Sequence, residues 1–421
     1  MFYSARFDNW PHRKSVFVTF MSISVVGGGL TGCLIALELA ESGRSVVLFE
    51  KEAEILTRAS YANEGKIHLG FVYAADTSFR TAKRMIDDAL QFRPVLERWI
   101  SSREFDEMLY DRFDYLVPNS SMLSADAIEA HFNLVMQYLK EQVATKSASY
   151  LGQGNLQPVV RSGTDNTNLQ ARFSTPEQGV WPAAIAQKIR ECVSLHPKIE
   201  VRVGTAISKI RSERNAWFVT FEASDLRDEG PFDQIVNCAW AGRRRLDAAS
   251  GFPDDGEWFY RYKFGVVLKN ARAAFGGEPP RNSTAVLGAF GDSVYHSVED
   301  THYCSWYPVG MCFSSTDLAK DEPPRIDDPE KAILKTWKGY SAMDTTFEAL
   351  LSSKPLENAH IVGDFIAARA QSDIQDPQSK LHERHSYGSV ELAPGYWSVE
   401  TGKYTSAARC AHECSQRVRG R

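Results

Sequence analysis

The stretch SISVVGGGLTGCLIALELAESGRSVVLFEK, residues 22–51, decides how this chain folds. It begins with a short run rich in β-branched apolar residues, as buried parallel strands do. Gly27, Gly29 and Gly32 follow in the spacing G-x-G-x-x-G. In a strand–turn–helix unit, the first glycine permits a tight turn and the second lets a pyrophosphate approach the backbone. The third lets the helix lie close to the strand.

A helix, a second strand and an acid complete this unit in the expected order. Residues 31–42 predict the helix, Gly43 its end, and residues 45–49 the strand that Glu50 closes. An acid roughly 20 residues after the glycine turn suits a ribose 2′-hydroxyl and repels a 2′-phosphate, so NADP is disfavoured. We therefore predict a dinucleotide site. The alternative is a tight strand–helix turn that binds no ligand.

Composition limits the class of protein. A chain of 421 residues suggests two domains or one intertwined pair, and a net charge of -5 argues against a nucleic-acid partner. The seven cysteines are scattered, which suggests reduced thiols and a cytoplasmic location. No run of 18 apolar residues is present, so we expect no membrane span, and we expect no metal site. Residues 1–20 are interpreted as an N-terminal extension.

The second informative stretch is ASYANEGKIHLGFVYAAD, residues 59–76. Small and polar residues come first, and the alternation of apolar residues over 67–73 predicts a strand. His68 lies among apolar neighbours, where a histidine can stay neutral and act as a base near pH 7. A histidine that is merely bonded to backbone fits the same pattern.

The remaining chain predicts alternating helices and strands. Helices are expected over residues 78–100, 124–140, 179–193 and 330–339 and from about 405, with strands over 104–118, 199–210, 216–221, 232–240, 359–365 and 396–399. Residues 147–175 are expected to be mainly loops, and short strands within 258–312 predict an antiparallel sheet.

Several stretches together resemble the FAD-dependent D-amino-acid oxidase superfamily. The glycine turn with Glu50 matches its FAD turn, and Gly179 with Pro182 and then 206–207 matches a G-x-x-x-P helix and the strand beside adenine. VNCAWAG, residues 236–242, is similar to its V-N-A-A-G-A-W. ETGKYT, residues 400–405, is similar to the T-G-H-G turn at the flavin's ribityl and pyrimidine end, with lysine in place of the histidine.

The loop NEGKIHLGFVY also resembles one branch of that superfamily. L-2-hydroxyglutarate dehydrogenases carry N-S-G-x-I-H-x-G-x-x-Y at this point, and glycerol-3-phosphate dehydrogenases carry a related I-H-G-G. The resemblance implies that His68 lies by the isoalloxazine ring and takes a proton from a substrate hydroxyl. Glu64 stands where those enzymes have a small residue.

The resemblance implies an α/β fold, with a Rossmann-like FAD-binding domain of the glutathione-reductase type and a mixed, largely antiparallel substrate domain. The first would comprise residues 21–80, 171–245 and 359–421, and the second residues 81–170 and 246–358. The cofactor would be FAD. The residues implied to bind it are Gly27, Gly29, Leu30, Thr31, Gly32, Glu50, Lys51, Ser60, Asn63, Gly65, Ile67, His68, Ile207, Cys238, Ala239, Trp240, Gly402, Lys403, Tyr404 and Thr405. The implied catalytic residues are His68, Tyr73, Arg384 and Lys403.

The function implied is removal of a hydride from the C–N carbon of a small polar amine, amino acid or amino-acid-derived metabolite. The alternatives are a 2-hydroxy-acid or polyol dehydrogenase and a flavoprotein without turnover. A monooxygenase is disfavoured because no second G-x-G-x-x-G is present for NAD(P)H. An anionic substrate would call for an arginine, with Arg261, Arg369 and Arg384 as candidates. His68 and Cys304 are candidate anchors for a covalent flavin, and the electron acceptor is oxygen or another molecule.

Overall fold

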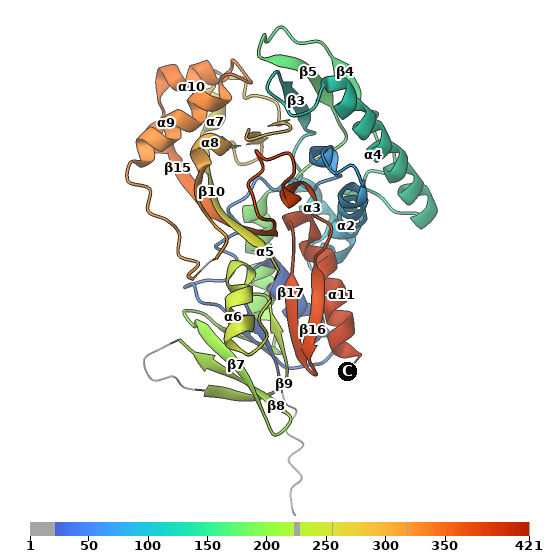
Figure 1. Ribbon diagram of the computed structural model, residues 1–421, viewed down its shortest axis with the longest axis vertical. Helices are drawn as coiled ribbons and strands as arrows, with labels where there is room; N and C mark the ends of the chain where they lie inside the picture. The colour runs from blue at the N-terminus through green and yellow to red at the C-terminus, as the bar shows by residue number, and fades with distance from the viewer. Residues whose placement is uncertain (1–21, 223–227, 255, 318, 421) are drawn as a thin grey trace, which may run out of the picture.

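Two β-sheets organise the chain, one in the lower and one in the upper part of Figure 1. The computed structural model describes residues 22–222, 228–254, 256–317 and 319–420. The extension expected at residues 1–20 lies outside them. The fold class predicted from the sequence is confirmed, since parallel strands alternate with helices in one sheet and antiparallel strands dominate the other.

The first sheet has the strand order β16-β17-β9-β1-β2-β6, with β7 and β8 added beside β9. Pairing is parallel from β17 to β6 and antiparallel between β16 and β17 and through β7, β8 and β9. The strands are β1 (Ser22–Val26), β2 (Val46–Phe49), β6 (Ile199–Arg202), β7 (Ile207–Glu213), β8 (Ala216–Phe221), β9 (Asp228–Asn237), β16 (Gly388–Ala393) and β17 (Tyr396–Glu400).

The second sheet has the order β14-β10-β13-β12-β11-β3-β5-β4, and β15 also pairs with β10. All its pairs are antiparallel except β11 with β3. The strands are β3 (Asp114–Pro118), β4 (Val160–Ser162), β5 (Leu169–Ser174), β10 (Trp258–Lys269), β11 (Ser283–Ala285), β12 (Asp292–His296), β13 (Thr301–Cys304), β14 (Met311–Ser315) and β15 (Ala359–Arg369).

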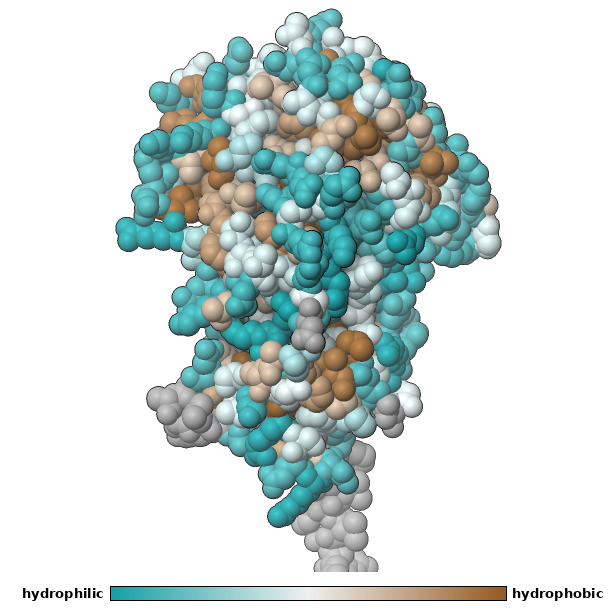
Figure 2. Space-filling model, viewed as in Figure 1, coloured by the Kyte–Doolittle hydropathy of each residue, from teal (hydrophilic) through white to brown (hydrophobic). Residues whose placement is uncertain are grey.

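Helices cover both sheets. The largest apolar cluster joins α1, α2, α4, α5 and α11, and a second cluster packs α9 and α10 on the second sheet. The α-helices are α1 (Leu30–Glu41), α2 (Arg80–Leu96), α3 (Ser102–Glu107), α4 (Ala125–Lys146), α5 (Pro182–Leu195), α6 (Arg243–Ala249), α7 (Ala271–Ala274), α8 (Tyr307–Gly310), α9 (Pro329–Tyr340), α10 (Phe347–Ser353) and α11 (Ala407–Arg419). On the face in Figure 2, hydrophobic residues lie in separate patches among hydrophilic ones, as expected when most apolar side chains are in the core.

Two strand predictions were wrong. Residues 67–73 form a loop ending in the short 3₁₀ helix η1 (Phe71–Tyr73), because the chain turns at Gly70, whose φ is +96°. The apolar alternation there reflects a loop that crosses the core. Part of the strand expected over 104–118 is helix α3, which a capping box between Ser101 and Glu104 begins.

Sheet membership also differs from the expected division of the chain at two places. β5 lies in the region expected to be loops and pairs with β3, and β15 pairs with β10 along its whole length. Residues 171–174 and 359–369 therefore belong to the second sheet, although they were grouped with the FAD-binding segments. These pairings join residues far apart in sequence, which local patterns do not reveal. The division into two domains otherwise stays a prediction.

Candidate active site

The glycine turn between β1 and α1 is packed as its spacing predicts. Gly27 has a φ of +105°, and a Cβ on it would lie 2.5 Å from the carbonyl oxygen of Cys238. A Cβ on Gly32 would lie 2.0 Å from the carbonyl oxygen of Gly27. Around Gly29, by contrast, a Cβ would have only the Ser60 hydroxyl within 4 Å, at 3.2 Å. The backbone is therefore tightly packed at Gly27 and Gly32, where α1 begins, while Gly29 between them stays accessible.

Polar groups converge on this turn. The N–H of Leu30 donates to the Ser60 hydroxyl at 2.8 Å, and the N–H of Gly28 donates to Glu50 Oε2 at 2.7 Å. The N–H of Glu52 donates to the other oxygen of Glu50 at 2.9 Å. Burial raises the pKa of Glu50, and these two N–H groups oppose that rise. Glu50 is therefore held rigidly where β2 ends.

One cavity, of about 290 Å³, starts at the glycine turn and reaches the second sheet. Most residues predicted to bind the cofactor line it: Gly27, Gly29, Leu30, Thr31, Gly32, Glu50, Lys51, Ser60, Asn63, His68, Ile207, Cys238, Ala239, Trp240, Gly402, Lys403 and Tyr404. The cavity thus brings together segments that are hundreds of residues apart.

Three of the predicted cofactor residues do not line the cavity. A Cβ on Gly65 would lie 1.9 Å from the carbonyl oxygen of Val180, so this residue packs against the segment just before α5. Ile67 is fully buried in the core. The Thr405 hydroxyl accepts from the N–H of His68 at 2.9 Å and donates to the carbonyl of Lys66 at 3.3 Å. These residues shape and hold the loop that carries His68.

Several charged residues of the cavity wall were not among the predicted site residues. Asp364 of β15 pairs with Arg58 at 2.7 Å, and Asp321 pairs with Lys51 at 2.5 Å. Lys263 of β10 also lines the cavity. Asp364 and Lys263 are charged residues with apolar or aromatic neighbours in largely apolar strands, a pattern that indicates a buried polar site. That signal was available in the sequence.

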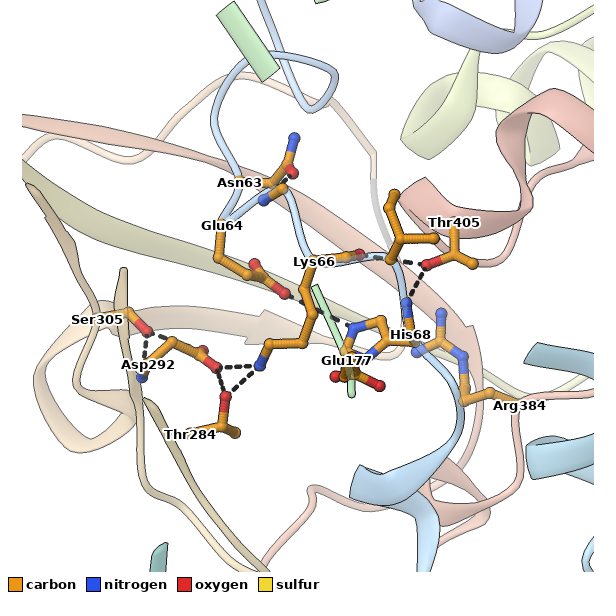
Figure 3. Close-up of polar contacts among 12 residues, drawn as sticks. Asn63, Glu64, Lys66, His68, Glu177, Thr284, Asp292, Ser305, Arg384 and Thr405 are labelled. Atoms are coloured by element: carbon orange, nitrogen blue, oxygen red, sulfur yellow. Dashed lines mark hydrogen bonds and ion pairs between the residues drawn. The ribbon is translucent and has the colours of Figure 1, made fainter. Parts of the chain in front are cut away.

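His68 lies between two carboxylates (Figure 3). Its Nε2 is 3.8 Å from Glu64 Oε1, and its Nδ1 is 3.8 Å from Glu177 Oε1. Burial and the charge of Lys403 lower the pKa of His68 to about 4, so the ring is neutral at pH 7. Burial raises the pKa of Glu64, but His68, Lys263 and Lys66 oppose this and bring it to about 2. The cavity wall therefore carries a neutral imidazole beside an ionised carboxylate.

Lys66 ties this loop to the second sheet. Its ammonium group is 2.9 Å from Asp292 Oδ1 and donates to the Thr284 hydroxyl, and Figure 3 shows the three side chains meeting. Lys263 is 3.4 Å from the other oxygen of Asp292. Asp292 is buried, which raises its pKa, but the two lysines hold the pKa well below its usual range. This buried network fixes the backbone two residues from His68.

Lys403 faces the same cavity as Glu64. Burial, and then the nearby charges of Arg384, Lys263 and Arg261, lower its pKa to about 8, while Glu64 raises it. Among the described residues Lys403 has no ion-pair partner, and its ammonium lies 5.9 Å from the centre of the Tyr73 ring. Lys403 is thus a cation in the cavity that forms no direct ion pair with the described residues and is favoured by the nearby charge of Glu64.

Tyr73 and Arg384, expected to be catalytic, lie behind the cavity wall. Tyr73 packs edge-on against His68, with ring centres 6.3 Å apart. The guanidinium of Arg384 donates to the carbonyl oxygens of Gly402 at 2.7 Å and Ala367 at 3.4 Å. Arg384 therefore supports the turn that carries Lys403.

The other arginines and the cysteine considered in the sequence analysis are also outside the cavity lining. Arg261 donates to the Tyr307 hydroxyl at 3.1 Å, and Arg369 pairs with Asp254 at 3.1 Å. Cys304, at the end of β13, is buried in the apolar cluster against α9 and α10 and does not line the cavity. His68 is the candidate anchor that lines the cavity.

Comparison with known proteins identifies the family. The sequence model described as "DAO: FAD dependent oxidoreductase" matches residues 22–295, which is more than half of the chain. This chain belongs to the DAO family of FAD-dependent oxidoreductases. The superfamily resemblance found in the sequence is thereby confirmed, and the cofactor is FAD.

The similar proteins have diverse activities. The chain is 39% identical to an FAD-dependent monooxygenase of Fusarium mangiferae over 228 residues, which is 54% of this chain and 51% of that protein. It is 35% identical to a mitochondrial L-2-hydroxyglutarate dehydrogenase of Caenorhabditis briggsae over 74 residues, 17% of each chain. The chain thus spans about half the length of the first relative and less of the second. Glycine oxidase from Geobacillus kaustophilus shares the fold, with a TM-score of 0.62 and 13% identity over 95% of both chains.

The residues around the cavity fit FAD. The open side of Gly29, the start of α1 and the fixed carboxylate of Glu50 are the kinds of group that would hold a pyrophosphate and a ribose. At the far end, Lys403 and Tyr404 line the cavity close to His68.

Within the described ranges, no helix is both long and apolar enough to cross a membrane.

Proposed function

We propose that this FAD-dependent oxidoreductase removes a hydride from the C–N carbon of a small amine that also carries an acidic group, such as an amino acid or a metabolite derived from one. The observation that carries the proposal is the placement of an ionised Glu64 and a cationic Lys403 in one cavity. A substrate with an ammonium and a carboxylate group complements both charges. Flavin, when bound, supplies the acceptor for the hydride.

His68 is proposed as the base of this reaction. The substrate nitrogen has to lose a proton before the neighbouring carbon can release a hydride, and a neutral imidazole accepts that proton. His68 lines the cavity, and its Nε2 is 3.8 Å from Glu64, where the ammonium would bind. Lys403 would hold the carboxylate. Glycine oxidase, which shares this fold, is named for an amine substrate.

The test is the anaerobic visible spectrum of the holoenzyme with amino acids and with the 2-hydroxy acids of the same carbon skeletons. We expect amino acids to bleach the flavin absorbance. Glu64→Gln keeps the size of the side chain and removes its charge, so bleaching should then need a higher amino-acid concentration. If hydroxy acids alone bleach the flavin, the proposal is wrong.

Oxidation of a 2-hydroxy acid is the second candidate. The I-H-x-G motif around His68 and the similarity to the L-2-hydroxyglutarate dehydrogenase favour it. A hydroxyl group must also lose its proton as the hydride leaves, which gives His68 the same role. Glu64→Ser restores the small residue of the resembling motif. If Glu64→Ser increases the rate at which hydroxy acids reduce the flavin, that result favours this candidate.

The Fusarium relative adds a third possibility, since its name describes a monooxygenase. Such an enzyme consumes NADH or NADPH, so reduction of the flavin by either nucleotide alone would favour this activity. A flavin that neither nucleotides nor amino or hydroxy acids reduce would instead favour a flavoprotein without turnover.

A further inference from the structure

Glu177 is a buried carboxylate for which the site described so far has no use. Its side chain has no solvent exposure, and it lies on the segment just before α5. The backbone of this segment is bonded to the loop of His68, since Ile67 N–H donates to the carbonyl of Gln178 at 3.0 Å and Val180 N–H donates to the carbonyl of Gly65 at 2.8 Å. These bonds hold Glu177 beside His68.

The carboxylate of Glu177 accepts two hydrogen bonds, and the neighbouring Nδ1 of His68 has none in the described part of the chain. One oxygen accepts from the N–H of Leu69 at 2.6 Å, and the other accepts from the Tyr115 hydroxyl. The second oxygen is also 3.8 Å from Nδ1 of His68, which is buried and has no hydrogen-bond partner among the described residues. An unpaired buried nitrogen costs stability, as does a buried carboxylate. A shared proton between these two groups would relieve both costs.

We propose that Glu177 is the positioning residue for His68: it holds the imidazole with its proton on Nδ1, which leaves Nε2 as the acceptor, and it takes the Nδ1 proton when Nε2 receives one from the substrate. The inference rests on the proposed role of His68 as the base.

The proton transfer balances. An N–H bond of the substrate ammonium breaks, its electron pair stays on nitrogen, and an Nε2–H bond forms. The Nδ1–H bond breaks and an O–H bond forms on Glu177. A cation and an anion are thereby replaced by two neutral groups, while the imidazole is neutral before and after. The transfer therefore creates no new charge in the buried region.

Glu177 rather than Glu64 sets the tautomer for two reasons. The Glu177 side chain has no solvent exposure while that of Glu64 is 22% exposed, and attraction to an N–H group is stronger where solvent is excluded. Burial raises the pKa of Glu177 to about 7, so its carboxylate can take up a proton near neutral pH. Lys66, the Tyr115 hydroxyl, the Leu69 N–H and Lys403 oppose this rise in the pKa of Glu177.

Nitrogen NMR of the ¹⁵N-histidine-labelled holoenzyme tests the tautomer directly and needs no substrate. The His68 signals are those missing from His68→Gln. At pH 8, above the pKa of Glu177, we expect wild-type His68 to carry its proton on Nδ1. In Glu177→Gln the new amide keeps its oxygen toward Leu69 and can donate to Nδ1, so the proton should move to Nε2. Tyr115→Phe removes a neighbouring bond but keeps the carboxylate, and it should retain the Nδ1 proton.

Stopped-flow reduction of the flavin tests the consequence. The wrong tautomer removes the base, so Glu177→Gln should slow flavin reduction by roughly 100-fold or more at saturating substrate, while the substrate concentration for half-saturation changes little. The rate in Glu177→Asp, which keeps the charge, should lie between those of wild type and Glu177→Gln.

Wild-type His68 with its proton on Nε2, or an unchanged tautomer in Glu177→Gln, overturns the inference whatever the activity. An equal loss of rate in Glu177→Gln and Tyr115→Phe would also overturn it, since it would show a merely structural role. A confirmed tautomer in an enzyme that no amine reduces would refute the proposed function and leave the pairing of Glu177 with His68 intact.

Discussion

Replacement of Lys66 by methionine should destabilise the protein substantially. The side chain is 1% exposed, and its ammonium group contacts Asp292 at 2.9 Å and the Thr284 hydroxyl. Methionine has a similar length and no charge, so Asp292 would be left buried with Lys263 as its remaining cation, at 3.4 Å. Breaking a buried ion pair costs about 3–5 kcal/mol. Because Lys263 and two hydroxyl groups still act on Asp292, we expect the lower end, about 3 kcal/mol.

The assay is equilibrium unfolding in urea, followed by tryptophan fluorescence at a fixed excess of FAD. Lys66→Met with Asp292→Asn removes both charges, so the double variant should regain part of the loss. Lys335→Met, on the exposed face of α9, is the matched control and should change the free energy of unfolding by less than about 0.5 kcal/mol. A Lys66→Met variant within about 1 kcal/mol of wild type, or a double variant less stable than the single one, would refute the reasoning.

Three further predictions concern the cofactor and the substrate. Gly32→Ala should lose FAD on gel filtration, because its Cβ would lie 2.0 Å from a backbone oxygen, whereas Gly154→Ala, with no atom within 4 Å of its Cβ, should stay yellow. Glu50 is expected to accept a hydrogen bond from the ribose, which Glu50→Gln would weaken, so titration of the apoprotein should show a Kd for FAD about 10- to 100-fold higher, and an unchanged Kd would contradict this role of Glu50. As pH rises through the Lys403 pKa of about 8, its ammonium loses the positive charge that would hold the substrate carboxylate, so kcat/KM should fall above pH 8. This limb should be absent from the pH profile of Lys403→Met, and its persistence there would assign it to another group.

The FAD turn was predictable because its determinants are local. The glycine spacing, the strand before it and Glu50 after it all lie within 30 residues, and the structure packs each glycine as its position predicts. The motif identified the segment around His68 correctly, but its secondary structure was predicted wrongly. Alternating apolar residues usually indicate a strand, and here they mark a loop that is buried on several sides.

The contacts of Glu177 and Asp292 could not be derived from the sequence in the same way. Glu177 follows a strand and precedes a helix, and nothing local indicates that Tyr115 and His68 meet it. The contact depends on β3 and on the pairing of the segment before α5 with the loop of His68. Asp292 is likewise brought to Lys66 by the packing of β12 against that loop. Long-range contacts of this kind require the fold.

The departures of this chain from the motifs that it resembles are themselves informative. Glu64 stands in place of a small residue and Lys403 in place of a histidine, and both new charges face one cavity. A buried charge normally survives only where a partner offsets its loss of hydration. Lys66 satisfies that condition within the protein, because Asp292 accepts from it. Lys403 has no ion-pair partner among the described residues, and Glu64 offsets only part of the cost of burying its charge, so a bound anion would stabilise it further. An anionic group beside Lys403 and a cationic group beside Glu64 are therefore the features in which a search for the substrate should begin.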